Sequence, residues 1–346
     1  MREFFLTLLV SIFLAACGAT ILTQPDSSAG SPPTETSIAI NDDRLNVVTT
    51  VSPITNIIYN IGGDRINLFG IVPEGTNSHT FEPAPSDATK LAQADLIFIN
   101  GLHLELPTLK LAEANKKDDA EIIVLGEQTI TPDEYVYDFS FPEEAGSPNP
   151  HLWTNPLYAL RYAEIGRDAL VKRDPANADY FNQNYDAFKA RIEALDQTIQ
   201  ATINSIPAAD RKLLTYHDSW AYFSPHYGMT VIGAIQPADF SEPSAREVAD
   251  LITQLRQEEV PAIFGSEVFP SPVLDQIAKE AGVQYIDTLR DDDLPGQPGD
   301  SNHSYLGLMV EDVKIMSKAL GGNPDLIADF DTSNVTGVDQ MVEQAQ

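Results

Sequence analysis

Residues 95–100 read Asp-Leu-Ile-Phe-Ile-Asn, with four apolar residues in succession. A strand with one solvated face alternates polar and apolar residues, whereas an unbroken apolar run suits a parallel sheet buried on both faces. Helical spacing precedes this run at 86–94 and follows it at 106–115, and a further strand pattern lies at 121–125. Strands that alternate with helices predict βαβ units and a parallel sheet.

The same alternation extends in both directions along the chain. Strands are expected at 45–51, 66–72, 95–100, 121–125, 212–216, 229–235, 262–266 and 283–289. Helices are expected at 53–61, 86–94, 106–115, 156–173, 220–227, 245–258, 272–281 and 305–320. Residues 127–150, in contrast, form a long irregular acidic stretch, which in a compact domain is often functional.

A long helical pattern divides these two series of elements. Asp174 and Pro175 form an N-cap and a first-turn proline. From there to residue 206 the apolar residues recur every three or four positions without Gly or Pro, which predicts a rod of ~45 Å. We therefore expect an α/β fold class, with two α/β lobes that contain parallel sheets and are joined by a long rigid backbone helix. The expected boundaries are 44–155 for the N-terminal lobe, 156–206 for the linking helices, 207–322 for the C-terminal lobe and 323–346 for a polar, frayed tail.

The N-terminus has the pattern of a secretory signal. An apolar run of about eleven residues, too short to span a bilayer, leads into Leu14-Ala15-Ala16-Cys17. This string resembles the bacterial lipobox, and Cys17 is the chain's only cysteine. We expect 1–17 to be a lipoprotein signal peptide and lipobox, 18–43 to be a flexible tether, and the protein to lie outside the cytoplasm on a lipid anchor.

Composition excludes several classes of protein. Lys and Arg total 21 against 51 for Asp and Glu, giving a net charge of −30. Nucleic acids and anionic lipid surfaces are bound by basic surfaces, so neither is expected as a partner. A single cysteine excludes an internal disulfide framework and a cysteine-ligated zinc site.

Histidines follow several of the expected strands, where α/β folds place ligands. His79 and His151 belong to the N-terminal half, and His217 directly follows the strand at 212–216. Three consecutive aspartates, at 291–293, follow the last strand. Three imidazoles and a carboxylate would form a four-coordinate site for Zn²⁺, and mixed nitrogen and oxygen ligation also admits Mn²⁺.

Three motifs carry a resemblance to a known family. Residues 75–105 read GTNSHTFEPAPSDATKLAQADLIFINGLHLE, residues 148–156 read PNPHLWTNP, and residues 215–229 read TYHDSWAYFSPHYGM. Together they resemble the metal-binding motifs of the cluster A-I (cluster 9) solute-binding proteins, which are zinc and manganese receptors of bacterial ABC importers. The segments EPSAREVADLI, GSEVFPSP and HSYLGLMVEDV match as well, so the resemblance extends from about residue 45 to residue 322.

The resemblance implies two lobes with the metal held between them. It places metal ligands at His79, His151 and His217, the last at a position where other members carry Glu. The fourth ligand in the family is an Asp after the last strand. Counting back from the aliphatic Leu294 selects Asp292, which we prefer, whereas counting from the strand end selects Asp291; Asp287 and Asp293 are further candidates.

The resemblance also implies a transported metal and a partner. Members with His at the third position tend to bind zinc, although residues 110–150 lack the histidine-rich loop of many zinc receptors. We expect a monomer that carries Zn²⁺, or Mn²⁺ next, to an ABC transporter permease. Because imidazoles must be neutral to bind a metal, affinity should fall steeply below pH ~6.5.

Other residues and functions are secondary expectations. His103 and His226 are expected away from the metal, His303 at a helix start, and Glu267 beside a ligand imidazole that it orients. A metal-dependent hydrolase with Glu82 or Glu267 as base is disfavoured, because a fourth protein ligand leaves no open position for water. A surface adhesin is the third alternative, at most as a secondary role.

Overall fold

The computed structural model describes residues 43–268 and 271–336. The expected signal peptide at 1–17, with Cys17, and all of the tether at 18–43 except its last residue lie outside these residues. Among the helices of the described residues, none is both long enough and apolar enough to cross a membrane.

The first sheet contains four parallel strands in the order β2-β1-β3-β4. Their bounds are β1 Leu45–Thr49, β2 Ile66–Gly70, β3 Leu96–Ile99 and β4 Glu121–Val124. All four residues of β3 are buried, as the unbroken apolar run predicts. The helices of this half are α1 Ser52–Gly62, α2 Pro85–Gln93 and α3 Leu106–Asn115.

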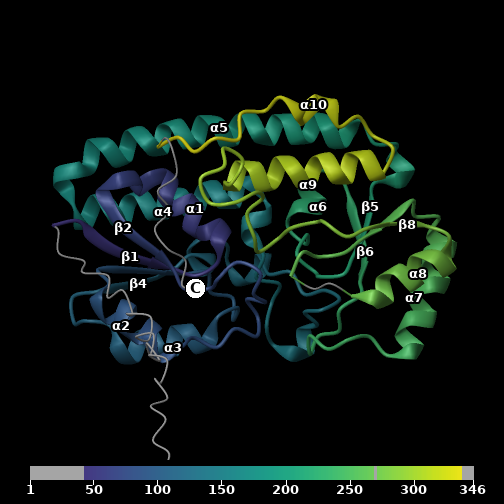
Figure 1. The fold of residues 1–346 in the computed structure, drawn as a ribbon, viewed down its shortest axis with the longest axis horizontal. Helices are drawn as coiled ribbons and strands as arrows, with labels where there is room; N and C mark the ends of the chain where they lie inside the picture. The colour runs from purple at the N-terminus through teal and green to yellow at the C-terminus, as the bar shows by residue number, and fades with distance from the viewer. Residues whose placement is uncertain (1–42, 269–270, 337–346) are drawn as a thin grey trace, which may run out of the picture. The chain divides into compact units, whose positions relative to one another are not determined.

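The second sheet repeats this architecture in the order β6-β5-β7-β8, again with parallel strands (Figure 1). Its strands are β5 Lys212–Thr215, β6 Thr230–Ala234, β7 Ala262–Phe264 and β8 Gln284–Ile286. Its helices are α6 Phe223–His226, α7 Ala245–Glu258 and α8 Pro272–Ala281. The expected strands at 229–235 and 283–289 are thus present but shorter.

Two long helices connect the sheets, α4 Pro156–Arg173 and α5 Ala178–Asn204. The apolar positions of α5 form one buried stripe: Phe181, Tyr185, Phe188, Ile192, Leu195, Ile199 and Ile203. This stripe packs against α1 and α4 on the side of the first sheet and against α9 Tyr305–Ala319 (Figure 1). The expected fold of two α/β lobes joined by a long helix is confirmed, and side chains from both sheets and α5 form one continuous core.

The expected helix at 220–227 is reduced to the four residues of α6. Side chains of the other half donate hydrogen bonds to backbone carbonyl oxygens just before and within the expected helix. Asn149 Nδ2 donates to the carbonyl of Asp218, and Asn155 Nδ2 donates to that of Tyr222. These bonds fix the segment that follows His217.

The C-terminal segment is packed as far as it is described, so the expectation of a frayed tail is wrong for 323–336. It contains α10 Asp325–Ala328, and Ile327 is fully buried. Further along, the amide of Val335 donates to Asn60 Oδ1, and Arg191 Nη1 donates to the carbonyl of Ser333. Ile327, with Phe330 and Val335 packed partly buried against the same core, and a few side-chain bonds thus order a segment with polar composition.

Candidate metal centre

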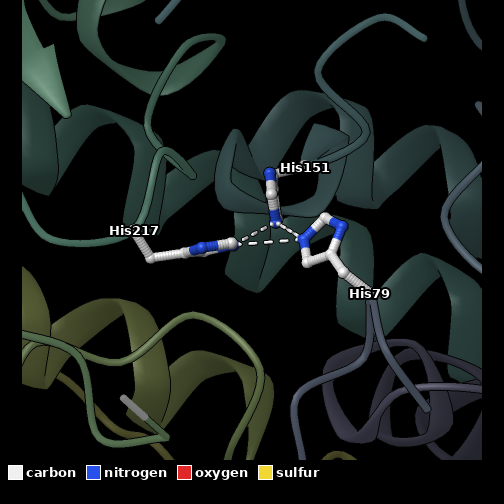
Figure 2. Close-up of side chains that lie close together, drawn as sticks. All are labelled: His79, His151 and His217. Atoms are coloured by element: carbon white, nitrogen blue, oxygen red, sulfur yellow. Dashed lines mark hydrogen bonds between the residues drawn. The ribbon is translucent and has the colours of Figure 1, made fainter. Parts of the chain in front are cut away.

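The three histidines that the sequence singles out meet at one point. His79 lies in the loop after β2, His151 directly precedes the short helical turn before α4, and His217 lies two residues beyond β5. Their Nε2 atoms are 3.1 Å apart for His79 and His151, 3.2 Å for His79 and His217, and 2.9 Å for His151 and His217. Figure 2 shows the three rings with these nitrogens facing one another.

This spacing fits a shared cation. Nitrogens that bind one zinc ion tetrahedrally at ~2.0 Å lie about 3.3 Å from each other. The three nitrogens can therefore bind the same ion after shifts of only a few tenths of an ångström. Since imidazole is a ligand that Zn²⁺ and other transition metals favour, the donor set fits such an ion.

Hydrogen bonds to the opposite ring nitrogens orient two of the imidazoles. His151 Nδ1 lies 2.8 Å from Asn149 Oδ1, and His217 Nδ1 lies 2.7 Å from Gln236 Oε1. Because each amide oxygen can only accept, Nδ1 carries the proton and Nε2 keeps its lone pair for a metal. The Asn149 side chain is itself fixed, since its Nδ2 donates to the carbonyl of Asp218. Neither Asn149 nor Gln236 was identified from the sequence.

The environment keeps the imidazoles neutral. Burial lowers the pKa of His79 and His151 well below 6.5, and repulsion from the neighbouring imidazoles adds to this effect. Burial also lowers the pKa of His217, against opposing contributions from Asp292 and Gln236. At neutral pH all three rings can therefore act as ligands.

The aspartates at 291–293 form the carboxylate side of the centre. Asp291 Oδ2 is 3.5 Å from His217 Nε2. Asp292 Oδ2 accepts a hydrogen bond of 2.7 Å from Ser78 Oγ, and among the described residues its buried Oδ1 has no hydrogen-bond partner. Asp293 instead accepts from the amide of Gly75, and Asp287 is exposed. Asp291 and Asp292 are thus the carboxylates available beside the triad.

Glu267 does not orient an imidazole, so that expectation is wrong. Its Oε1 accepts hydrogen bonds from the backbone amides of Asp291, Asp292 and Asp293, at 3.0, 3.3 and 3.2 Å. The carboxylate therefore fixes the acidic loop rather than a histidine. Glu267 is only partly exposed and lies next to three aspartates. Burial together with the charge of Asp291 raises its pKa.

Comparison with known proteins places this geometry in a family. The family described as zinc-uptake complex component A, periplasmic, matches residues 47–319. The chain belongs to this family.

The names of its relatives mention several different metals. The chain is 30% identical over 285 residues to the manganese ABC transporter substrate-binding lipoprotein PsaA of Streptococcus pneumoniae, covering 80% of this chain and 90% of that protein. It is 31% identical over 279 residues to the iron-binding protein YfeA of Yersinia pestis, covering 80% and 87%. The periplasmic zinc-binding protein TroA of Treponema pallidum has a similar structure, with a TM-score of 0.73 and 26% identity, over 80% of this chain and 99% of that one.

Family membership confirms the expected class of protein. Members of the zinc-uptake component A family are metal-binding subunits of ABC importers and not enzymes, so the hydrolase alternative is wrong. The candidate bases agree with this outcome, because Glu82 is exposed and Glu267 bonds to backbone amides. The relatives' names do not single out zinc or manganese.

The remaining histidines lie outside the triad. His103 is exposed and its Nδ1 is 3.0 Å from Ser147 Oγ, while His226 is exposed and pairs with Asp196. His303 lies just before α9, as expected, and is fully buried with Nδ1 3.2 Å from the carbonyl of Pro295. None of the three belongs to the group of converging imidazoles among the described residues.

Proposed function

We propose that this protein captures Zn²⁺ between its two lobes and delivers it to the permease of an ABC importer, with Mn²⁺ as the next candidate. The observation that carries the proposal is the convergence of three Nε2 atoms from both halves of the chain. A site assembled from two lobes can release its ion when the lobes separate. That property suits a carrier that must both bind a metal and hand it over.

The choice of zinc rests on the ligand types. Three neutral imidazoles and one carboxylate match the nitrogen-rich tetrahedral sites of zinc, whereas manganese favours carboxylate, carbonyl and water oxygens. His217 supplies a nitrogen at the position where the family resemblance places Glu in other members. Four protein ligands also leave no open position for a catalytic water.

We infer that Asp292 is the fourth ligand. Its Oδ2 is held by Ser78, one residue before the ligand His79, and its buried Oδ1 is the oxygen offered to the metal. Asp291 is the competing candidate, because its Oδ2 lies 3.5 Å from His217 Nε2 and both of its oxygens are buried without a hydrogen-bond partner among the described residues. The two aspartates can therefore be separated only by substitution.

Location and partners follow from the same proposal. A lipid at Cys17 would hold the protein outside the cytoplasm, and the tether at 18–43 would let the metal-binding part reach the permease. We propose that it works as a monomer, with lobes at 44–155 and 207–322 and linking helices at 156–206. The PsaA relative is named as a lipoprotein of an ABC transporter, which supports this arrangement.

Competitive titration with Zn²⁺ and Mn²⁺ tests the proposal. The wild-type protein should bind one equivalent of Zn²⁺ more tightly than Mn²⁺. Asp292→Asn should weaken Zn²⁺ binding by about 100-fold or more, whereas Asp291→Asn should weaken it by no more than about tenfold. The reverse order would make Asp291 the ligand, and tighter binding of Mn²⁺ would overturn the choice of zinc.

A further inference from the structure

Two phenylalanine rings cover the histidine triad, one from each half of the chain. Phe141 comes from the long loop between β4 and α4, and Phe240 from the loop between β6 and α7. The Phe141 ring centroid is 5.5 Å from that of His79 and 5.7 Å from that of His151. Phe240 stacks on His79, with centroids 4.6 Å apart and an interplanar angle of 23°.

His79 differs from the other two imidazoles in how its ring is held. His151 and His217 are buried and each has an amide oxygen at Nδ1, whereas His79 is partly exposed. Within the part of the chain that the structure describes, no hydrogen bond reaches His79 Nδ1; its ring interacts through Nε2 and through aromatic neighbours. A metal-binding imidazole normally has an acceptor at its second nitrogen, which fixes the ring. The contacts that lie against the His79 ring from outside the triad are instead those of Phe141 and Phe240.

The backbone of Phe240 adopts a conformation that is costly for this residue type. Its φ is +58°, in the left-handed region that favours glycine. A turn stabilises it, because the amide of Phe240 donates to the carbonyl of Pro237 and Asp239 accepts from both the amide and the hydroxyl of Ser241. Strain of this kind persists where surrounding structure enforces it, and it gathers at functional sites.

The two covering loops are also tied to each other and to the centre. Ser140 Oγ, next to Phe141, donates to the carbonyl of Gln236 at 2.6 Å. The side chain of the same Gln236 accepts from His217. Gln236 therefore links the loop of Phe141 to the imidazole of His217.

We propose that Phe240 is the positioning residue of His79 and that its stacked ring slows the release of the bound metal. This inference rests on the proposed function. His79 is the most exposed and least hydrogen-bonded of the three imidazoles, so it is the ligand expected to detach first. Phe240 opposes this by blocking rotation of the imidazole and by excluding water from its exposed face.

Release of Zn²⁺ from the purified full-length protein into excess chelator tests this inference. Loss of the ring in Phe240→Ala should speed release by about fivefold or more, as expected for the loss of an aromatic pair. Phe240→Gly should speed release to a similar extent, and glycine adopts the left-handed backbone conformation without strain. This variant therefore replaces Phe240→Ala if the alanine variant does not fold. Phe240→Tyr keeps the ring and should release Zn²⁺ at the wild-type rate.

Phe139→Ala is the matched control, because Phe139 is a phenylalanine of the neighbouring loop that is 49% exposed. Phe139→Ala should release Zn²⁺ at the wild-type rate. The melting temperature of metal-free Phe240→Tyr should equal that of the metal-free wild type. Unchanged release in both Phe240→Ala and Phe240→Gly would overturn the inference while the wild type still binds one Zn²⁺. A wild-type protein without bound Zn²⁺ would overturn the proposed function, and this inference with it.

Discussion

The hydroxyl of Ser78 donates a hydrogen bond of 2.7 Å to the carboxylate of Asp292, 214 positions further along the chain. The neighbouring amide of Gly75 donates to Asp293 in the same way. The loop that carries His79 is thereby fastened to the acidic loop of the other half. These two bonds thus hold His79 and the acidic loop at a fixed spacing, although they are far apart in the sequence.

Replacing Ser78 by Ala should weaken Zn²⁺ binding by about tenfold, the lower range for loss of a group that orients a metal ligand. The substitution leaves Asp292 Oδ2 without its hydroxyl donor. Competitive titration measures the effect, and Thr80→Ala is the control because Thr80 is exposed and lies as close to His79 in sequence. Equal affinities for Ser78→Ala and the wild type would show that this bond does not position the carboxylate.

Replacing Gln236 by Ala should weaken Zn²⁺ binding by about ten- to 100-fold. Without the amide oxygen at 2.7 Å, His217 loses the partner that fixes its tautomer and ring orientation. Gln254→Ala provides the comparison, since Gln254 also lies beside β6 but donates to the carbonyl of Ile232. Isothermal titration calorimetry distinguishes the two, and the same loss in both variants would indicate general damage to the sheet.

Metal bound at a fixed total metal concentration should fall as the pH is lowered, and the midpoint of that loss should lie below pH 6.5. Burial lowers the pKa of His79, His151 and His217, so protons compete with the metal only at lower pH than for exposed histidines. Affinity should therefore change little from pH 7.5 to 6.5 and fall only at lower pH, once protons bind the imidazoles. Titrations at stepped pH test this, with His226→Ala as the control because His226 is exposed. A midpoint above 6.5, or a flat profile down to pH 5, would contradict a site of three buried imidazoles.

The sequence predicted the elements of the fold better than their contacts. The run at 95–100 and the apolar spacing of α5 each determine a local structure, because burial on two faces or on one stripe leaves a regular pattern. His79, His151 and His217 were found through motifs that surround them. Asn149 and Gln236 were missed because their roles depend on which loops and strands become neighbours. The predicted role of Glu267 was wrong for the same reason, because the sequence does not show which backbone amides will donate to a carboxylate.

The packed C-terminal segment gives a pair of matched substitutions. Ile327 is fully buried, so Ile327→Ala should lower the free energy of unfolding by about 2–4 kcal/mol. Its neighbour Leu326 is 48% exposed, and Leu326→Ala should change it by no more than about 0.5 kcal/mol. Urea denaturation of both variants measures the difference. Equal small effects would mean that residues 323–336 contribute little to the core in solution.

The metal content of the purified protein tests the central claim most directly. After exposure to Zn²⁺ and removal of excess metal, elemental analysis should find one Zn²⁺ per wild-type chain and less than about a tenth of that in His217→Ala, because loss of a protein ligand disrupts a four-coordinate site. His103→Ala should retain the full equivalent, since His103 is exposed and bonds to Ser147 instead. A wild-type chain without stoichiometric metal, or a His217→Ala chain that keeps all of it, would contradict the three-histidine centre.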